Sequence, residues 1–278
     1  SEAESPKKGG TLVMMDEEIE LDIETLFKSS AFVLGSNRGS ILYKSITADG
    51  RVFAVRRIGR NQDEKFLDFK NRIKYLAKLK HENLVRVRGF YWGDEEKLIV
   101  CDHVHSNLSN LITRLSIEPR FKISKGIARG LAFIHDKKRV HGNVKPSNIL
   151  VTADLEAVVS DFGVPTEKGF ESSPYRAPEL VEKVKPDQKC DVFSFGVILL
   201  ELFTGRVRVE REIEEWVDGS VEMGLDRFGR LVEYGSQEEL ESCEKGLVAV
   251  LGLGFKCVSS VPCERPSMKE ALLLLQKL

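Results

Sequence analysis

The run from Asp191 to Thr204 constrains the fold most, because its side chains are apolar on almost every side of a helix. A helix without a polar face has to be surrounded by other elements. Asp191 is expected to cap the N-terminus of this helix, and Gly205 to end it. The chain has 278 residues, 42% of them hydrophobic, which is enough to enclose such a helix. The sequence therefore predicts a helical core in its C-terminal part.

The first hundred residues show a different pattern, with strand character on either side of one helix. Apolar residues at Phe66, Phe69, Ile73 and Leu76 recur at helical spacing, which predicts an amphipathic helix over residues 63–80. Short β-rich runs bounded by turn residues predict antiparallel strands. These runs are 31–34, 40–43, 52–55, 84–91 and 97–100. We expect a small β-rich lobe followed by a larger helical lobe.

Charge and cysteine content exclude several classes of protein. Lysine and arginine number 42 and aspartate and glutamate 43, so the net charge is −1. A near-neutral domain has no general attraction to nucleic acid or to an anionic membrane. The five cysteines include no Cys-x-x-Cys pair, which argues against a zinc site or a disulfide framework and favours a reducing compartment. The sequence has no apolar run long enough to span a bilayer, so any membrane anchor is expected upstream.

Several short motifs follow one another in a fixed order. They are Ala54-Val55-Arg56, the loop from His141 to Asn148, Asp161-Phe162-Gly163, Ala177-Pro178-Glu179, Asp191 and Arg265. Together they resemble a protein kinase domain. The loop containing Lys145-Pro146-Ser147-Asn148, the run Tyr175–Glu179 and the segment 191–205 are typical of plant leucine-rich-repeat receptor-like kinases. The resemblance covers roughly residues 27–278.

This resemblance implies an α+β, two-lobed protein-kinase-like fold. The β-rich N-lobe, with one main helix, would span about residues 27–102, and the helical C-lobe about 103–278. Residues 1–26 would form a polar leader or juxtamembrane linker, in which the acidic cluster at 16–20 is a solvated surface.

The glycine-rich loop that covers the nucleotide phosphates in the family is incomplete here. Gly35 occupies the first glycine position, but Asn37 and Ser40 occupy the second and third. Added side chains keep the backbone from approaching the phosphates closely. Either the phosphate cover is loosened or blocked, or this is simply a divergent hairpin.

The ion pair that positions the nucleotide in the family is also altered. Arg56 replaces the strand lysine, and a long planar guanidinium does not substitute for an ammonium in a tight site. Arg72 falls at the position of the helix glutamate that would pair with it. Asp68 lies four residues before Arg72 and is a candidate partner for Arg56 or Arg72, unless it belongs to a solvated charged face.

The catalytic loop reads His141-Gly142-Asn143 where the family has His-Arg-Asp. Asn143 therefore stands at the catalytic-base position, and a neutral amide can hold a hydroxyl group but cannot take its proton. Gly142 removes the arginine that would receive an activation-loop phosphate. Lys145, Asn148 and Asp161 are retained, and the last two are the expected ligands if magnesium binds.

Other residues match the family's scaffold. Cys101 and Val104 fall in the part of the chain that contacts adenine, and we interpret Cys101 as a buried small apolar residue. His141 and Phe162 are expected to stack. Glu179 and Arg265 would form a buried ion pair, and Asp191 would hold the backbone of the catalytic loop.

The segment 164–176 is shorter than in most family members, so it is not expected to hold a substrate peptide in the usual way. Four hydroxyl groups there are open to phosphorylation or are ordinary loop side chains. They belong to Thr166, Ser172, Ser173 and Tyr175.

The sequence therefore favours a receptor-like pseudokinase that acts as a signalling scaffold or allosteric partner of active receptor or co-receptor kinases. By resemblance it would lie on the cytoplasmic side of the plasma membrane, attached through an upstream transmembrane segment. No cofactor is required by this hypothesis, although weak binding of ATP and magnesium is compatible with Gly35, Arg56, Asn148 and Asp161. The alternatives are a weak or unconventional Ser/Thr kinase, and a module that senses a nucleotide without turnover.

Overall fold

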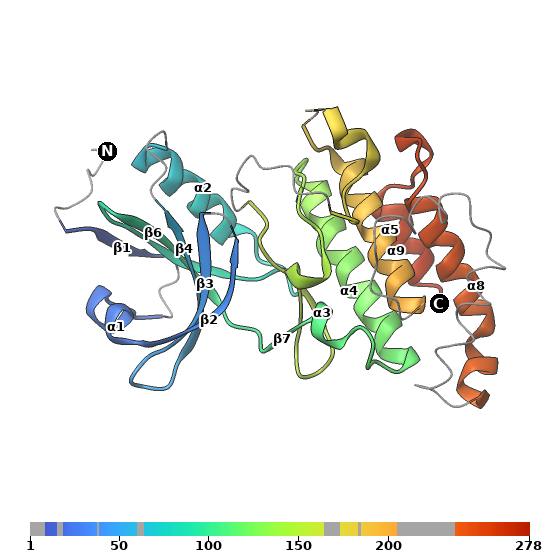
Figure 1. The fold of residues 1–278 in the computed structure, drawn as a ribbon, viewed down its shortest axis with the longest axis horizontal. Helices are drawn as coiled ribbons and strands as arrows, with labels where there is room; N and C mark the ends of the chain where they lie inside the picture. The colour runs from blue at the N-terminus through green and yellow to red at the C-terminus, as the bar shows by residue number, and fades with distance from the viewer. Residues whose placement is uncertain are drawn as a thin grey trace. The chain divides into compact units, whose positions relative to one another are not determined.

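The computed structural model describes residues 9–15, 19–37, 39–59, 64–163, 173–182, 185–204 and 237–278. These residues form two compact units (Figure 1). The first unit contains the described residues up to Val104, together with Gly163. The second contains His105–Phe162 and the described residues from 173 onward.

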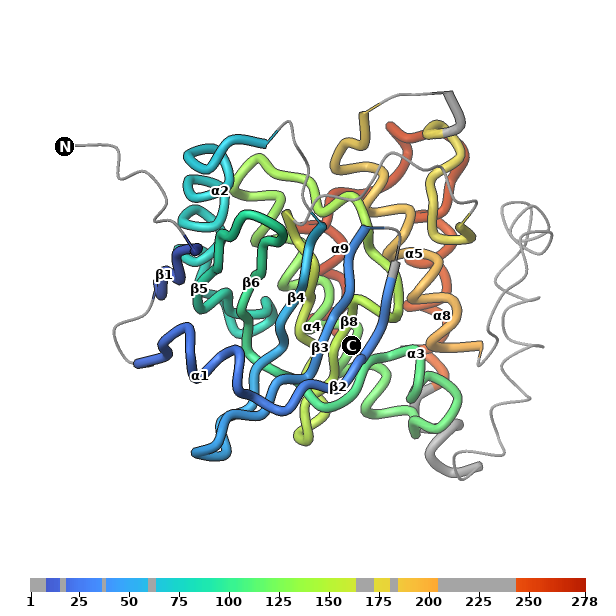
Figure 2. The backbone as a smooth tube through the Cα atoms, turned by 60° about the vertical axis from the view of Figure 1, so that its left-hand side comes forward, coloured from blue at the N-terminus to red at the C-terminus, as the bar shows by residue number. Residues whose placement is uncertain are grey.

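The first unit is a six-stranded antiparallel sheet in the order β1-β5-β6-β4-β3-β2, with two helices. Figure 2 shows β4, β3 and β2 running side by side. The strands are β1 (Thr11–Met14), β2 (Ser30–Asn37), β3 (Ser40–Ile46), β4 (Val52–Gly59), β5 (Val87–Trp92) and β6 (Glu96–Asp102), and the helices are α1 (Ile23–Lys28) and α2 (Phe66–Lys78). The amphipathic helix and the antiparallel strands predicted from periodicity are confirmed. Helix α2 buries Phe69, Ile73 and Leu76, the face that the spacing indicated.

Part of the expected leader belongs to the first unit. Strand β1 pairs with β5, from Thr11 opposite Trp92 to Met14 opposite Gly89. Helix α1 follows, and its N-cap Asp22 accepts a hydrogen bond of 2.7 Å from the backbone N–H of Thr25. Leu21 and Leu26 join the core of the sheet. Residues 1–8 and the acidic positions 16–18 lie outside the described residues.

The second unit is mainly helical, with a small antiparallel sheet in the order β7-β8-β9. Its helices are α3 (Leu108–Leu111), α4 (Ile117–Asp136), α5 (Gln188–Thr204), α8 (Gln237–Cys257) and α9 (Met268–Leu275), its 3₁₀ turns are η1 (Pro146–Asn148), η2 (Pro178–Glu182) and η4 (Pro262–Glu264), and its strands are β7 (Ser106–Asn107), β8 (Ile149–Val151) and β9 (Ala157–Val159). Helix α9 starts with the expected capping box of Ser267 and Glu270. Within the described ranges, no helix combines the length and apolarity needed to cross a bilayer.

Helix α5 is the buried apolar helix that the sequence predicted, but the expected N-cap is wrong. The helix begins at Gln188, three residues earlier, and Asp191 lies inside its first turn. The side chain of Asp187 accepts hydrogen bonds from the backbone N–H groups of Lys189 (2.8 Å) and Cys190 (3.1 Å). Asp187 therefore pairs with free backbone N–H groups at the start of the helix, and the carboxylate of Asp191 is not needed as a cap.

The contact between α5 and α8 leads to a stability prediction at Gly196. A Cβ atom there would lie 2.5 Å from Cys257 Cβ and 2.9 Å from Val258 Cγ1, so Gly196→Ala should destabilise the fold by about 1–3 kcal/mol through overpacking. Gly252→Ala in α8 is the matched control, because a Cβ there meets nothing within 4 Å. Chemical denaturation should show a loss only for Gly196→Ala, and equal effects would contradict the packing.

Candidate functional site

A buried carboxylate on α5 holds the loop from His141 to Asn148. Asp191 is 1% exposed and accepts hydrogen bonds from the backbone N–H groups of His141 (2.7 Å) and Gly142 (2.8 Å). Its Oδ2 also lies 2.9 Å from Nε2 of His135 on α4. The two backbone contacts fix the start of the loop, and the contact with His135 ties the same carboxylate to α4.

Gly142 adopts a backbone conformation that suits glycine, with a φ of +77°. A Cβ atom there would have room, since it would lie 3.6 Å from Pro186 Cγ. The position therefore restricts side chains through backbone strain and not through space. Because Gly142 has no side chain, this position cannot provide a cation for a phosphate group.

The rest of the loop is tied to the segment that follows β9. Asn148 donates from Nδ2 to the carbonyl of Asn143 (2.9 Å), and its own carbonyl accepts from the N–H (2.9 Å) and Oγ (3.0 Å) of Ser160. His141 Nε2 lies 2.8 Å from the carbonyl of Ser160. These contacts place Asn143, at the expected base position, and Asn148, an expected metal ligand, in one rigid stretch.

Asp161 follows Ser160 directly and has a φ of +63°, which is rare for a residue with a side chain. The rings of His141 and Phe162 lie 6.1 Å apart at an angle of 40°, so they are neighbours in a tilted arrangement. Lys145 is half-buried at the edge of η1. The side-chain oxygens of Asn148 and Asp161 are of the ligand type that magnesium prefers, so the chemistry of these two residues suits a Mg²⁺ ion.

Arg56 contacts another of the altered positions within the first unit. Its side chain is 8% exposed, and Nη1 donates a 3.2 Å hydrogen bond to Oγ of Ser40. Ser40 occupies the third glycine position of the phosphate loop, on the strand paired with β4. The side chain of Asn37 lies outside the described residues. Arg56 and Ser40, two residues that differ from the family pattern, are therefore hydrogen-bonded to each other.

Arg72 has partners other than Asp68, and the exposed Asp68 agrees with the alternative of a solvated charged face. Arg72 Nη2 lies 2.7 Å from Oε1 of Glu64, and its Nη1 donates to the carbonyl of Gly163 (3.0 Å). The (i, i+4) spacing had indicated a local partner on the helix. Glu64 lies just before the helix, where its carboxylate contacts Arg72 and Lys97 of the sheet. This carboxylate is less exposed than that of Asp68.

Glu64 also binds Lys97, a residue that sequence reasoning missed. Lys97 Nζ lies 2.9 Å from Oε2 of Glu64, and Lys97 is only 2% exposed. Burial alone would raise the pKa of Glu64, but hydrogen bonds from Lys97 and Arg72 outweigh burial and hold this pKa below its usual range. The sequence did contain a signal for a buried lysine, because Lys97 directly precedes the apolar strand residues 98–100.

The segment expected to contact adenine is held by a bidentate ion pair. Arg88 Nε and Nη2 lie 2.6 and 2.9 Å from the two carboxylate oxygens of Asp102. Cys101 is half-buried, and not fully buried as expected. Val104, also half-buried, is the last residue of the first unit before the chain enters the second.

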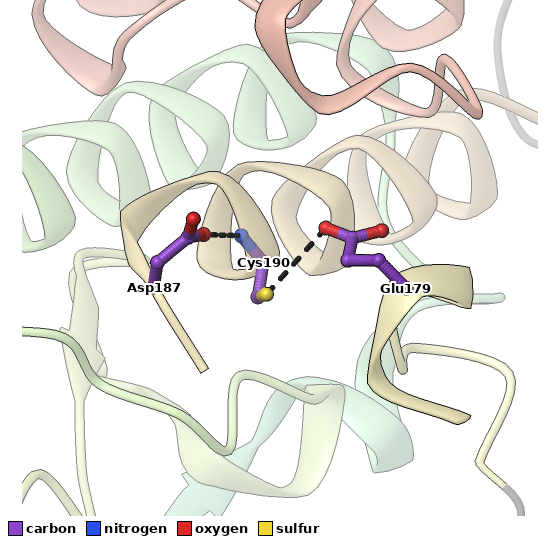
Figure 3. A group of neighbouring side chains, drawn as sticks. All are labelled: Glu179, Asp187 and Cys190. Carbon is purple, nitrogen blue, oxygen red and sulfur yellow. Dashed lines mark hydrogen bonds between the residues drawn. The ribbon is translucent and has the colours of Figure 1, made fainter. Parts of the chain in front are cut away.

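Glu179 and Arg265 form a bidentate ion pair in the second unit. The distances are 2.5 Å from Nη1 to Oε1 and 2.8 Å from Nη2 to Oε2, and the Arg265 side chain is fully buried. Cys190 donates to Glu179 (3.5 Å), and Asp187 caps the same helix (Figure 3).

These three side chains, Glu179, Asp187 and Cys190, could in principle ligate a metal, since their ligand atoms lie within 4.8 Å of one another. Burial, however, raises the pKa of Cys190 to about 12, so its thiol stays protonated. Both oxygens of Glu179 already bind Arg265. The cluster is a structural junction between η2, α5 and Arg265.

Tyr175 is the phosphorylation candidate whose hydroxyl the structure places in a defined contact. Its hydroxyl donates a 2.8 Å hydrogen bond to Oε2 of Glu201, which is 1% exposed, and its carbonyl accepts from Oγ of Ser194 (2.6 Å). This contact indicates a structural role for the hydroxyl. Ser173 is half-buried, whereas Thr166 and Ser172 lie outside the described residues.

Comparison with known proteins shows the family. Residues 30–274 match the protein kinase domain, so the chain belongs to the protein kinase domain family. The expected two-lobed α+β kinase fold is confirmed by solved structures. The pseudokinase domain of BIR2, an immune regulator of the RLK/Pelle family, has a TM-score of 0.79 at 27% identity, covering 97% of this chain and 89% of that one.

A second solved structure is the maize sucrose-induced receptor kinase 1 kinase domain bound to AMP-PNP. It has a TM-score of 0.74 at 25% identity, covering 96% of this chain and 99% of that one.

The curated relatives are plant receptor-like kinases. A probable leucine-rich-repeat receptor-like serine/threonine-protein kinase of Arabidopsis thaliana is 41% identical, with 96% of this chain and 42% of the relative covered. A probable inactive leucine-rich-repeat receptor-like protein kinase of the same plant is 34% identical, with 95% and 44% covered. The chain spans about two fifths of the length of these relatives.

The left-handed backbone at Gly142 leads to a prediction. Gly142→Ala should lower the free energy of unfolding by about 1–2 kcal/mol, because an alanine at positive φ is strained even where space is available. Gly35→Ala is the control, since a Cβ there meets nothing and no positive φ is required. Urea denaturation of both variants measures the difference, and a neutral Gly142→Ala would contradict the assigned backbone.

The lowered pKa of Glu64 predicts a pH-dependent contribution to stability. The carboxylate stabilises the fold above its unfolded pKa of about 4.3, and this contribution disappears as the pH falls through the lower folded pKa. Glu64→Gln should therefore destabilise the fold at pH 7, by about 1–3 kcal/mol for breaking a partly buried pair, and the difference should shrink as the pH falls through the folded pKa of Glu64. Thermal melts of both proteins between pH 3 and 7 test this, and a constant difference would refute the assignment.

Proposed function

We propose that this chain is a catalytically impaired kinase domain that works by binding protein partners. The observation that carries the proposal is Asn143 at the catalytic-base position, in a loop whose backbone is otherwise held in place by Asp191 and Asn148. The scaffold of the site is retained, while the group that would accept the substrate proton is absent. Loss of a general base typically slows a reaction by about 10²–10⁴-fold.

The phosphate-binding elements support the same proposal. Arg56 binds Ser40, and Arg72 binds Glu64 and Gly163, so each cation has a partner other than the one its family position implies. Two arginines at these positions cannot form the family's lysine–glutamate pair. Positioning and charge neutralisation supply most of the catalysis in phosphoryl transfer, so these changes add to the loss of the base.

A nucleotide-binding role is the second candidate, and specific residues favour it. Lys145, Asn148 and Asp161 are retained, and the oxygens of the last two suit magnesium. A structural relative binds AMP-PNP. Bound nucleotide would supply the transferable phosphate in a weak kinase, or would stiffen the domain for a partner in a nucleotide sensor. Of this chain's residues, Lys145 would hold the γ-phosphate and Asn148 and Asp161 the metal.

The proposed partners are active receptor or co-receptor kinases. Relatives include receptor-like kinases and the pseudokinase domain of BIR2, an immune regulator. We place the whole protein in the plasma membrane, with this domain on the cytoplasmic side and leucine-rich repeats outside. This location rests on the relatives, which are more than twice as long as the part they share with this chain.

Restoring two family residues tests the proposal. Asn143→Asp combined with Arg56→Lys should raise phosphorylation of a generic substrate such as myelin basic protein by at least about 10²-fold over the wild type, because it returns a base and a compact cation. Asn143→Asp with Arg56→Met is the matched control and should gain less. A wild type that transfers phosphate well above background, at the rate of the double variant, would overturn the proposal.

A further inference from the structure

Helix α2 is fastened to the first unit by a chain of four groups. Lys97 on β6 binds one oxygen of Glu64, the other oxygen binds Arg72 on α2, and Arg72 donates to the carbonyl of Gly163. The distances are 2.9 Å from Lys97 Nζ to Glu64 Oε2, 2.7 Å from Arg72 Nη2 to Glu64 Oε1, and 3.0 Å from Arg72 Nη1 to the Gly163 carbonyl. A strand, the segment before the helix, the helix itself and the glycine that ends Asp161-Phe162-Gly163 are thus linked through one carboxylate.

The surroundings make this carboxylate hard to replace. Lys97 is 2% exposed, and its ammonium lies 4.3 Å from the ring centroid of Trp92 and 5.5 Å from that of Phe69. The Arg72 guanidinium lies 5.0 Å from the Phe69 ring. A desolvated ammonium that loses its anion is strongly destabilised, even with aromatic rings nearby. Glu64 therefore neutralises two cations that the aromatic side chains orient.

The chain of contacts does not pass through the nucleotide-binding position on β4. In the family, the helix is held through a glutamate that pairs with the strand lysine, a residue that also contacts the phosphates. Here the residue at the glutamate position, Arg72, points to Glu64 and Gly163, while Arg56 contacts Ser40. The residues that hold α2 are therefore separate from those expected to meet a phosphate.

We propose that Glu64 is a built-in latch that holds helix α2 and Gly163 in one arrangement without any nucleotide. The latch makes the position of α2 independent of whether a nucleotide is bound. The latch is compatible with a pseudokinase and with a weak enzyme alike, because its contacts do not include Lys145, Asn148 or Asp161, the residues expected to hold phosphate and magnesium. A domain with this device presents the same α2 surface to a partner at every nucleotide concentration.

Hydrogen exchange followed by mass spectrometry tests the latch. In the nucleotide-free wild type, the backbone amides of residues 66–78 should be protected, and ATP with magnesium should change their exchange less than twofold. Glu64→Gln should speed their exchange at least tenfold and leave α4 and α5 unchanged. Glu24→Gln is the control, because Glu24 forms an exposed pair with Lys28 that contributes little.

Two results would overturn the proposal. One is unchanged protection of α2 in Glu64→Gln, and the other is a tenfold or greater gain in protection of wild-type α2 when nucleotide is added. If Glu64→Gln fails to fold, Arg72→Lys replaces it, since a lysine keeps the charge but cannot bridge Glu64 and Gly163 with two nitrogens. That variant should speed exchange in α2 at least threefold, and no change would equally refute the latch.

Discussion

The buried carboxylate of Asp191 is the interaction on which the second unit's site depends. It lies in the first turn of an apolar helix and binds two successive backbone N–H groups of the loop that carries Asn143. A carboxylate at 1% exposure is stable only when its oxygens are satisfied, so helix and loop constrain each other. The loop keeps a defined backbone at His141 and Gly142 whatever side chain stands at the base position.

This separation of scaffold from chemistry explains how the domain can keep its fold while its catalytic groups change. Packing and buried polar contacts fix the backbone, through Asp191 with the loop and Arg265 with Glu179. Among the residues expected to meet phosphate or magnesium, Asn148 also supports the loop, through its hydrogen bond to the carbonyl of Asn143. In the first unit, the substituted cations have taken new partners, Ser40 and Glu64, so their charges remain hydrogen-bonded.

Periodic or local signals predicted the elements, and the family resemblance indicated two long-range contacts, Asp191 with the catalytic loop and Glu179 with Arg265. Long-range contacts that are not family features were missed. The 3.6-residue spacing located α2, and the apolar run located α5, because burial shapes both patterns. The local pattern wrongly placed Asp191 at the N-cap, whereas the resemblance to kinases already indicated its contact with the catalytic-loop backbone, about 50 residues earlier. Glu64 was missed because a glutamate in a charged stretch looks solvated, and strand β1 because four residues carry little pattern. Family motifs supplied the positions of the candidate site, but not the partners of Arg56 and Arg72.

Turnover by the purified wild-type domain tests the central claim most directly. Transfer of labelled γ-phosphate from ATP would be followed at saturating magnesium, beside Asp161→Asn, which removes an expected metal ligand, and Asp154→Asn as a control on an exposed turn. The account predicts that all three proteins give the same background signal. Transfer well above background that disappears only in Asp161→Asn would contradict it and identify the domain as a working kinase.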